Sequence, residues 1–549
     1  MSTIGNYKHS DIRNGNPKFS ALKTTVESAF YGNNVTPVDT ISEAYERAAN
    51  LPNVTKLDAD VKHHEELGLP DGAKIIVAFD GAIIGRTAKA RKVYGQNKKL
   101  DDKLLGVVRD AILEGSHKPF ISGKSIVGLD EDFMLKAHIM MPETYAPTLY
   151  SWLLNFQIDN EEYAKRYANS REYDENDLYL YFDPEWKHED FPDGLAYFDV
   201  KANVACILGL SYFGETKKGT LTLAWAIASR TGYVSCHGGM KIFDERYTAA
   251  FFGLSGSGKS TLTHAKHNGK YEIKVLHDDA YIISLNDYSS IALEPSYFDK
   301  TNDYPTGHRE HDYFVTVFNS GVTLDEDGKK VIVSEDIRNG NGRTVKSRYS
   351  TPNRVDKITQ PITSIFWIMK DNSLPPVLKV TDPVMASIMG CTLATKRSSA
   401  ENVKNFDELV IEPYANPFRA YPLTMDYNNF KTLFEQGIEC YIINTGDFLD
   451  KDIKPKDTLG ILEDIVDDKA EYKEFPYIQG FEYSPLNHFH LPNDNFLYTS
   501  LLHERMETRL DFVKKHNKSH PNGSLPKEVE QRLSRIVEQL SQMKLMQKK

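Results

Sequence analysis

The sequence predicts a two-lobed α/β protein, and three observations support this fold class. From Ala73 onward, short apolar runs typical of β-strands alternate with turn residues and helical stretches. The chain has 549 residues, well above the roughly 150 that one domain usually holds. A glycine-rich loop follows one predicted strand and opens a helix-compatible segment. We therefore expect an N-terminal lobe over residues 1–235 and a C-terminal lobe over residues 236–549.

The predicted strands are short apolar runs bounded by turn or charged residues. They lie at residues 74–81, 81–85, 177–182, 202–210, 247–254, 313–318, 329–334 and 439–446. One helix is expected in the segment SEAYERAANL at residues 42–51. Another is expected over residues 527–546, because apolar residues recur there at helical spacing. Those residues are Val529, Leu533, Ile536, Val537, Leu540 and Met543. We expect this last helix to dock on its own domain rather than on a membrane or a partner.

Composition and charge narrow the class of protein. The 77 acidic residues outnumber the 66 Lys and Arg, and the resulting net charge of -11 argues against broad nucleic-acid binding. No apolar run approaches the roughly 20 residues that span a bilayer, and the N-terminus lacks the apolar core of a secretion signal. The four cysteines form no CxxC pair, so we expect neither a disulfide framework nor a zinc site. These features favour a cytoplasmic protein with no nucleic-acid or membrane partner.

The strongest motif is GLSGSGKS at residues 253–260, which fits the P-loop pattern G-x-x-x-x-G-K-[ST]. It follows the strand-like YTAAFF and precedes the helix-compatible TLTHAKH. In such a loop, backbone N–H groups and the helix N-terminus bind a phosphate chain, Lys259 reaches the terminal phosphates, and the Ser260 hydroxyl ligates Mg²⁺. The predicted nucleotide-binding residues are Leu254, Ser255, Gly256, Ser257, Gly258, Lys259, Ser260 and Thr261.

Two acidic residues end another short apolar run downstream of the loop. The segment KVLH leads into Asp278 and Asp279, and a strand that ends in this way can deliver carboxylates to a Mg²⁺-bound nucleotide. Taken alone, such a pair is more often a solvated turn or a helix cap. Its position shortly after the P-loop is what favours the functional interpretation.

The order of the motifs resembles the ATP-dependent phosphoenolpyruvate carboxykinase family. YFGETKKG at residues 212–219 is followed by His237, then by the P-loop, then by HDDA at residues 277–280. This order, and nearly the spacing, is that of the family's own motifs. P-loop proteins in general carry no such upstream partners.

Two further segments are similar to that family. GAIIGRTAK at residues 81–89 resembles its early G-x-x-x-GR-[ST]-x-K segment, and GRTVKSRYSTP at residues 342–352 resembles the segment that supplies a second arginine. The likeness covers residues 73–464 in patches. It implies a two-lobed phosphoenolpyruvate carboxykinase-like fold with a P-loop mononucleotide-binding C-terminal lobe, and an active site in the cleft between the lobes.

The family converts oxaloacetate and ATP to phosphoenolpyruvate, CO₂ and ADP, which requires a stabilised enolate and an in-line phosphoryl transfer. The resemblance implies that Lys218, His237 and Asp279 hold a divalent ion, usually Mn²⁺, that acts as a Lewis acid. A lysine ligates a metal only when it is neutral, so burial and the cation must favour its uncharged form. The resemblance also implies Mg²⁺ at Ser260, with Asp278 behind the ion.

Four more residues take roles from the same resemblance. Arg86 contacts the substrate carboxylate and Arg348 the transferring phosphate, because a guanidinium offers planar, paired donors that stay charged. Tyr212 donates to the carboxylate that leaves as CO₂, and Lys217 bridges substrate and phosphate. Taken singly, each of these residues is more often structural or a surface charge. Their joint order is what supports the assignment.

The chain departs from the family pattern in three places. HDDAYII stands where the family has GDDEHGW, and Leu459 stands where the family usually has an arginine that stacks on adenine. Residues 391–401 resemble the glycine- and threonine-rich lid only loosely, and the lid is expected near residues 392–399. The preference for ATP therefore comes from the resemblance alone.

These departures leave two alternatives open. One is a P-loop kinase of the same fold that phosphorylates another small acid or a protein, but the retention of Arg86 and Arg348 argues against it. The other is a catalytically silent nucleotide-binding paralogue, but the retention of Lys218, His237 and Asp279 argues against that. The sequence leaves the oligomeric state open.

Overall fold

The computed structural model describes residues 20–156, 161–254, 256–338, 340–396, 409–486 and 489–548. The chain divides into two compact units. Unit 1 consists mainly of Met1–Ile227 and Ala292–Pro352, and unit 2 mainly of Ala228–Ile291, Asn353–Ser398 and Val403–Lys549. This division differs from the expected contiguous lobes, because Ala292–Pro352 belongs to unit 1. The roles that the sequence suggested for the two lobes stay predictions.

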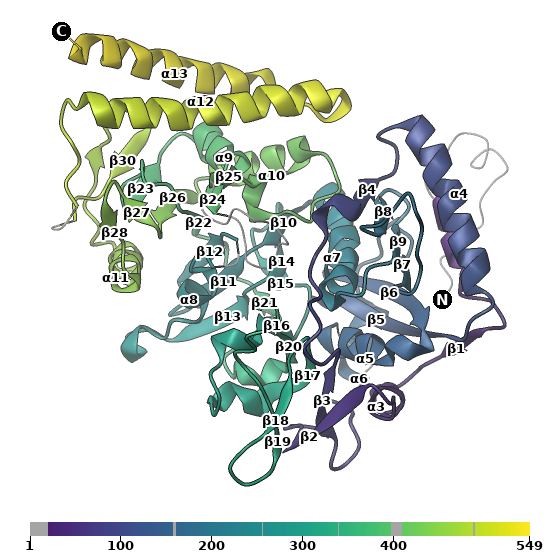
Figure 1. Ribbon diagram of the computed structural model, residues 1–549. Helices are drawn as coiled ribbons and strands as arrows, with labels where there is room; N and C mark the ends of the chain where they lie inside the picture. The colour runs from purple at the N-terminus through teal and green to yellow at the C-terminus, as the bar shows by residue number, and fades with distance from the viewer. Residues whose placement is uncertain are drawn as a thin grey trace. The chain divides into compact units, whose positions relative to one another are not determined.

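The larger sheet of unit 1 has seven strands in the order β1-β5-β6-β7-β9-β8-β4 (Figure 1). The strands are β1 (Val35–Pro37), β4 (Arg91–Val93), β5 (Phe120–Asp130), β6 (Phe133–Pro142), β7 (Leu178–Asp183), β8 (Leu195–Asp199) and β9 (Val204–Leu208). β7 and β9 run parallel and are buried along their whole length. Burial on both faces explains why they read as nearly continuous apolar runs. The strands predicted at residues 177–182 and 202–210 are confirmed.

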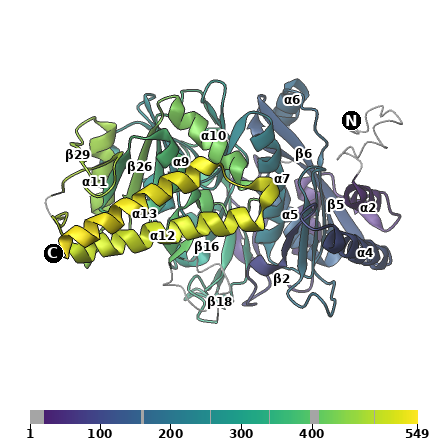
Figure 2. The ribbon, with the colours of Figure 1, turned by 90° about the horizontal axis from the view of Figure 1, so that it is seen from above.

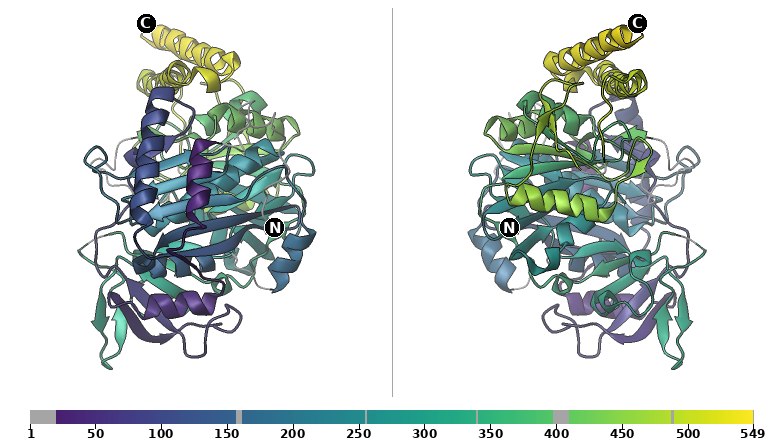
Figure 3. Two further views of the ribbon diagram at one scale, coloured as in Figure 1. Left: turned by 90° about the vertical axis from the view of Figure 1, so that its right-hand side faces the viewer. Right: turned by 90° about the vertical axis from the view of Figure 1, so that its left-hand side faces the viewer.

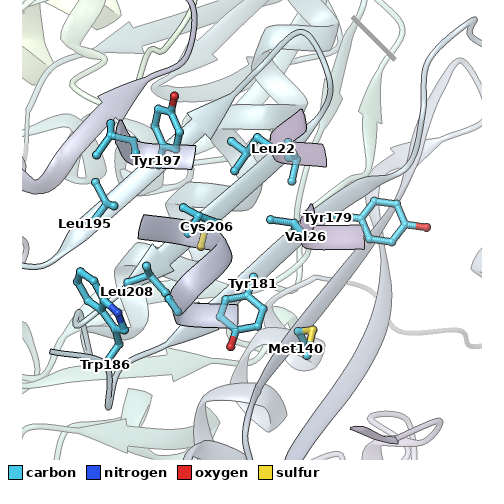
Figure 4. Packing of buried hydrophobic residues seen from close by; sticks show 14 of the residues in the cluster. Leu22, Val26, Met140, Tyr179, Tyr181, Trp186, Leu195, Tyr197, Cys206 and Leu208 are labelled. Atoms are coloured by element: carbon cyan, nitrogen blue, oxygen red, sulfur yellow. The ribbon is translucent and has the colours of Figure 1, made fainter. Parts of the chain in front are cut away.

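Two helices lie side by side on one face of this sheet, α2 (Ala21–Ala29) and α4 (Lys98–Gly115) (Figures 2 and 3). Each begins at a polar cap, since the Ser20 hydroxyl accepts from the Lys23 amide and the Asn97 side chain accepts from the Leu100 amide. Their apolar faces form one buried cluster with the sheet. Figure 4 shows Leu22 of α2 with Cys206 of β9 in this cluster.

Two other helices of unit 1 carry residues of the candidate site described below: α5 (Ala146–Asn155) and α7 (Phe213–Arg230). Gly219 of α7 lies so close to Ile207 and Leu180 that a Cβ there would stand 3.1 Å and 3.3 Å from their side chains. Neighbouring strand residues point to opposite faces, so α7 packs on the face away from Cys206. The Trp152 indole of α5 donates to the Thr220 hydroxyl at 2.9 Å, which joins the two helices.

The smaller sheet of unit 1 has the order β16-β20-β17-β3-β2. Its strands are β2 (Val54–Asp60), β3 (Lys74–Ala78), β16 (Tyr297–Lys300), β17 (Phe314–Phe318) and β20 (Arg343–Lys346). β17 pairs in parallel with β3, and this pairing ties the segment from Ala292 to the N-terminal part of the chain. The remaining elements of unit 1 are α3 (Ile41–Ala49), α6 (Glu161–Asn169) and the hairpin β18 (Val322–Leu324) with β19 (Lys330–Ile332).

These elements confirm the predicted helix at residues 42–51 and the strands near residues 74–78, 313–318 and 329–334. The strand predicted at residues 81–85 is wrong. Gly81 has a positive φ of 62°, which breaks an extended run. The carbonyl of Ile84 accepts from side-chain amides instead of from a neighbouring strand.

The main sheet of unit 2 has eight strands in the order β13-β11-β12-β22-β26-β23-β30-β29. They are β11 (Gly239–Phe243), β12 (Tyr247–Phe252), β13 (Ile273–His277), β22 (Ser364–Met369), β23 (Val377–Val380), β26 (Glu439–Asn444), β29 (Lys473–Glu474) and β30 (Phe481–Tyr483). β12, β22 and β26 run parallel at its centre. The strands predicted at residues 247–254 and 439–446 are confirmed. Helix α11 (Pro455–Val466) packs its apolar side on one face of this sheet (Figures 1 and 3).

A second sheet of unit 2 has the order β10-β14-β15-β21, with β10 (Tyr233–His237), β14 (Ala280–Ser284), β15 (Ser290–Ala292) and β21 (Lys357–Ile358). Two separate hairpins complete the strands of unit 2. One pairs β24 (Ala394–Lys396) with β25 (Leu409–Ile411), and the other pairs β27 (Asp447–Phe448) with β28 (Lys451–Asp452). The shorter helices are α8 (Lys259–His264), α9 (Pro383–Cys391) and α10 (Leu423–Glu435).

The chain ends in two long helices that lie side by side, α12 (Phe496–Ser519) and α13 (Lys527–Gln547) (Figures 1 and 2). α13 confirms the predicted C-terminal helix, and its apolar residues at positions 529, 533, 536 and 540 are buried. It docks on its own unit, because Glu528 accepts from the Tyr427 hydroxyl at 2.7 Å and from the Lys431 ammonium at 3.0 Å. Within the described ranges, no helix has the combined length and hydropathy needed to cross a membrane.

Candidate active site

The glycine-rich segment runs from the end of β12 to the start of α8. Gly256 and Gly258 have φ angles of 81° and 94°, in the left-handed region that favours glycine. The Ser257 amide donates to the Leu254 carbonyl at 3.0 Å, and the Thr445 hydroxyl at the end of β26 donates to the Ser257 carbonyl at 2.7 Å. The chain around the two glycines is therefore held by its own backbone and by the neighbouring strand.

The polar residues that follow this turn are exposed or half-buried. Ser260 and Thr261 are exposed in the first turn of α8 and Lys259 is half-buried, whereas Leu254 is buried beside the strand. Ser255 lies outside the described residues. Because α8 is only six residues long, its partial charge is small, and Lys259 with the loop amides would supply most of the attraction for an anion.

Asp278 follows β13 and faces the start of α8. The Ser260 hydroxyl donates to its Oδ2 at 3.2 Å, and His264 Nε2 lies 3.4 Å from the same oxygen. Burial acts to raise the pKa of Asp278. The hydrogen bond and charge of His264, with the charges of His277 and Lys259, outweigh burial and hold that pKa well below its ordinary value. Asp278 is therefore a carboxylate at neutral pH, suited to stand behind a cation on Ser260.

Besides Ser260 and Asp278, unit 2 brings together a second pair of predicted site residues, His237 and Asp279. His237 ends β10 and is 7% exposed. Its Nδ1 lies 2.5 Å from the Ala415 carbonyl oxygen, and its Nε2 lies 3.1 Å from Oδ1 of Asp279. A carbonyl only accepts, so Nδ1 carries the ring proton and the Nε2 lone pair faces the carboxylate. Two acceptors this close require a shared proton or a shared cation.

The spacing of this pair fits a divalent metal. Two ligands at about 2.0–2.2 Å from one cation and at roughly a right angle are about 3 Å apart, as the Nε2 and Oδ1 atoms are. Lys259 Nζ lies 4.0 Å from the same Asp279 oxygen, so the pair adjoins the phosphate-facing end of the loop. In the part of the chain that the structure describes, no group of three or more His, Cys, Asp and Glu could hold a metal. A complete site would thus need a ligand of another type.

The predicted third ligand, Lys218, belongs to unit 1. It lies in α7, is 9% exposed, and its Nζ stands 5.7 Å from the centre of the Trp225 ring. Its neighbour Lys217 is completely buried, and its ammonium forms an ion pair with Glu294 at 2.8 Å. The Asn155 amide donates to the other Glu294 oxygen at 2.6 Å. Glu294, which sequence reasoning missed, therefore fixes the position of Lys217.

The predicted substrate residues of unit 1 separate into two places. Arg343 Nε donates to the Tyr212 hydroxyl at 3.0 Å, and both residues are buried. Arg348 instead donates to the Tyr163 hydroxyl at 2.8 Å and lies over that ring. Arg343 is the first arginine of the segment GRTVKSR, and sequence reasoning chose the second. The signal that distinguishes them is the buried strand β20, which starts at Arg343.

Arg86 follows the turn at residues 81–85 and is half-buried. Burial lowers the pKa of Arg91 to about 10, Glu215 opposes the shift, and the charge of Arg86 adds to it. Arg86 and Arg91 are thus near enough to repel each other. An anion placed between two such guanidinium groups would be attracted to both.

The structure shows the surroundings of two of the departures from the family's motif pattern, Leu459 and the predicted lid. Leu459 in α11 packs against the buried cluster on the main sheet of unit 2, so an apolar residue suits its position. The predicted lid near residues 392–399 falls partly on described residues, where β24 pairs with β25. Residues 397–399 lie outside the described ranges.

Fold and site together define an α/β protein with a glycine-rich strand–loop–helix segment followed by a histidine–aspartate pair. A family model described as phosphoenolpyruvate carboxykinase matches residues 86–490, which is more than half of the chain. The chain therefore belongs to the ATP-type phosphoenolpyruvate carboxykinase family, as the motif order predicts.

A curated relative agrees with this assignment. The chain is 25% identical over 299 residues to "Phosphoenolpyruvate carboxykinase (ATP)" of Aeropyrum pernix. The alignment covers 51% of this chain and 60% of that protein. The chain thus spans less than two thirds of the relative it matches.

Proposed function

We propose that the chain is an ATP-dependent phosphoenolpyruvate carboxykinase, which converts oxaloacetate and ATP to phosphoenolpyruvate, CO₂ and ADP. Membership of the family supports the general activity. The observation that carries the proposal is the His237–Asp279 pair beside Lys259, because it joins a candidate metal pair to a candidate phosphate loop. The reaction needs both groups, one for the enolate and one for the phosphoryl group.

In this proposal, the loop binds the phosphates of the nucleotide. The amides around Gly256 and Gly258 would donate to phosphate oxygens, and Lys259 would reach the terminal phosphates. Ser260, with Asp278 behind it at 3.2 Å, would hold Mg²⁺. This arrangement would orient the γ-phosphate for transfer and offset its charge.

The second cation, which we take to be Mn²⁺, would be held by His237, Asp279 and Lys218. Bound there, a divalent ion supplies Lewis-acid stabilisation of a developing enolate oxygen. The chain's own contribution is orientation: the Ala415 carbonyl holds the proton on Nδ1 of His237, so that Nε2 keeps its lone pair for a ligand.

The substrate would be bound by residues of unit 1. Arg343 and Tyr212, already in contact, would donate to the oxaloacetate carboxylate that leaves as CO₂, and Arg86 would bind the other carboxylate. Lys217 would act chiefly through its fixed charge, because Glu294 holds its ammonium. The contact of Arg348 with the transferring phosphate stays a prediction.

The experiment is a coupled assay for phosphoenolpyruvate with oxaloacetate and ATP, GTP or pyrophosphate. We expect turnover with ATP, and loss of that turnover in Lys259→Ala. Activity of the variant within a few-fold of wild type would remove the loop from the mechanism. A protein that makes no phosphoenolpyruvate with any donor yet binds Mn²⁺ would favour a P-loop kinase with another acceptor. If it binds no Mn²⁺ tightly either, the silent nucleotide-binding paralogue is favoured.

A further inference from the structure

Unit 2 contains a cavity whose lining includes none of the predicted catalytic, nucleotide-binding or metal-binding residues, although Ala394 lies in the segment where the lid is expected. It lies between the hairpin β24–β25 and helix α12 and has a volume of about 340 Å³. This volume falls at the small end of the range of roughly 300–1,000 Å³ that is common for small-molecule sites. The hairpin supplies an apolar wall, made of Leu409, Val410 and Ile411 with Ala394.

The opposite wall is one face of α12. Arg505, Arg509 and Phe512 line it at helical spacing, and Lys515 follows near the end of the helix. Asp511 is the one acidic residue among those lining the cavity. The cavity therefore combines an apolar side with a mainly basic side.

The two arginines share one buried counter-charge, Asp371. Arg509 Nη2 lies 3.0 Å from Oδ2 of Asp371, and Arg505 Nε lies 3.5 Å from its Oδ1. Asp371 is completely buried and Arg509 is 1% exposed. Arg505 Nη1 also lies 3.7 Å from Oε1 of the exposed Glu504, so the second counter-charge of the pair is a solvated carboxylate, which offsets a guanidinium only weakly.

The guanidinium groups of Arg505 and Arg509 also lack some of their hydrogen-bond acceptors. The Nε atoms of Arg505 and Arg509 are both buried without a hydrogen-bond acceptor. A guanidinium has five N–H donors, and a buried donor without an acceptor is destabilising. The two Nε atoms are enclosed, so a ligand with two acceptor oxygens would bond instead to the guanidinium N–H groups that reach the cavity, chiefly those of Arg505, whose side chain is 23% exposed.

We propose that this cavity binds a small organic anion that carries a carboxylate or a phosphate monoester on an apolar or aromatic body. The anionic group meets Arg505, Arg509 and Lys515, and the body lies against Val410 and Phe512. The apolar wall is what excludes a bare inorganic ion as the preferred ligand. Binding here is separate from the proposed carboxykinase reaction, and one can fail without the other.

Fluorine NMR titration of the full chain tests the proposal. The probes are 4-fluorobenzoate and 4-fluorophenyl phosphate, with uncharged 4-fluorobenzyl alcohol as the comparison. We expect saturable binding of at least one anionic probe and at least tenfold weaker binding of the alcohol. Inorganic phosphate is expected to compete at least tenfold more weakly than the bound probe.

Four variants locate the binding. Lys515→Gln changes an exposed side chain and should weaken the bound probe at least fivefold, and Arg505→Gln should weaken it at least tenfold. Lys514→Gln, on the same helix but outside the cavity, should leave binding unchanged. Lys259→Ala should also leave it unchanged, because the glycine-rich loop is a different anion site.

Several results would overturn the assignment. It fails if neither anionic probe binds saturably, or if Lys515→Gln and Arg505→Gln both bind as wild type does. Loss of binding in Lys259→Ala would place the probe on the loop instead. Competition by inorganic phosphate as strong as by the aromatic anion would show that the apolar wall contributes nothing.

Discussion

Nε2 of His237 lies 3.1 Å from Oδ1 of Asp279, while the opposite nitrogen of the same ring lies 2.5 Å from a main-chain carbonyl. The carbonyl belongs to Ala415, which has a positive φ of 51°. A backbone turn far along the sequence thus fixes the tautomer of the histidine and the direction of its lone pair. Metal affinity should depend on this geometry as well as on the two side chains.

Asp279→Asn is expected to weaken Mn²⁺ binding at least about tenfold, because the amide keeps the shape of the side chain and loses its charge. Electron paramagnetic resonance of free Mn²⁺ measures the change. Asp287→Asn, on the exposed turn after β14, is the matched control and should bind as wild type does. Equal Mn²⁺ affinity in Asp279→Asn and wild type would contradict the metal pair.

Gly258→Ala tests the backbone of the glycine-rich loop. A Cβ there would be in ordinary van der Waals contact with Thr445 Cγ2 at 3.7 Å, but the φ of 94° is unfavourable for alanine. We expect a loss of about 1–2 kcal/mol in the free energy of unfolding together with at least tenfold weaker ATP binding. Denaturant unfolding and nucleotide titration measure the two effects.

The control for that variant is Gly460→Ala in α11, where a Cβ meets nothing within 4 Å. There the helical backbone suits alanine, so stability should rise by roughly 0.5–1 kcal/mol with ATP binding unchanged. The same loss of ATP binding in both variants would count against a specific role for the loop.

Arg343→Gln and Arg348→Gln separate the two arginines of one segment. Because Arg343 contacts Tyr212 directly, its substitution should lower kcat/KM for oxaloacetate by at least about 100-fold, equal to a loss of about 2.7 kcal/mol. Arg348→Gln should have the smaller effect on KM for oxaloacetate. The opposite ranking would mean that Arg348, rather than Arg343, contributes to oxaloacetate binding.

The sequence predicts those parts of the molecule that local patterns encode. Buried parallel strands such as β9 are continuous apolar runs, and the α13 pattern is a clear helical stripe. The segment at residues 81–85 is apolar too, but it forms no strand because long-range contacts use its backbone. The Ile84 carbonyl accepts from the side-chain amides of Asn319 and Asn341, which lie more than two hundred residues away in the sequence.

The same limit applies to the site. The motif order predicts His237 and Asp279 as partners, and the structure places their side chains 3.1 Å apart; their role as metal ligands stays a prediction. It named Arg348 and did not name Arg343, because the contact of Arg343 with Tyr212 exists only in the folded chain; the roles of both arginines stay predictions. Nor could it find Glu294, whose partner Lys217 is far away in sequence and is brought close only by folding.

Glu294→Gln should destabilise unit 1 by about 3–5 kcal/mol, because it leaves the fully buried Lys217 ammonium without its counter-charge. The double variant Lys217→Met/Glu294→Leu removes both charges and should cost less than the single change. Denaturant unfolding compares the two. A double variant that is as unstable as Glu294→Gln, or more so, would show that packing rather than charge is lost.

A buried chain of three titratable groups lies behind α8. Lys241 is completely buried, and its Nζ lies 3.0 Å from His267 Nε2 and 3.2 Å from the Ala265 carbonyl oxygen. Nδ1 of His267 in turn lies 2.8 Å from Glu463, which Lys270 also approaches at 3.5 Å. Burial lowers the pKa of Lys241 to about 7 from 10.5, although Glu463 acts to raise it.

This shift predicts a stability that rises with pH. Between about pH 7 and 10, Lys241 is neutral in the folded chain and protonated in the unfolded chain, so the unfolded chain binds more protons. The free energy of unfolding should therefore increase across this window by up to about 1.4 kcal/mol per pH unit from this group. Burial lowers the pKa of His267 from 6.5, and hydrogen bonding with His267 lowers the pKa of Glu463 from 4.5. Both of those groups titrate below the window.

Urea unfolding at pH 7, 8 and 9 tests this slope in wild type and in Lys241→Met. The variant lacks the titrating amine, so its free energy of unfolding should rise with pH less steeply than that of wild type, by about 1.4 kcal/mol per pH unit at most. Lys266→Met, at an exposed position nearby, should keep the slope of wild type. Equal slopes in wild type and Lys241→Met would mean that the amine stays charged inside the folded chain. Its charge would then be stabilised by the Glu463 carboxylate and by the hydrogen bond to the His267 ring.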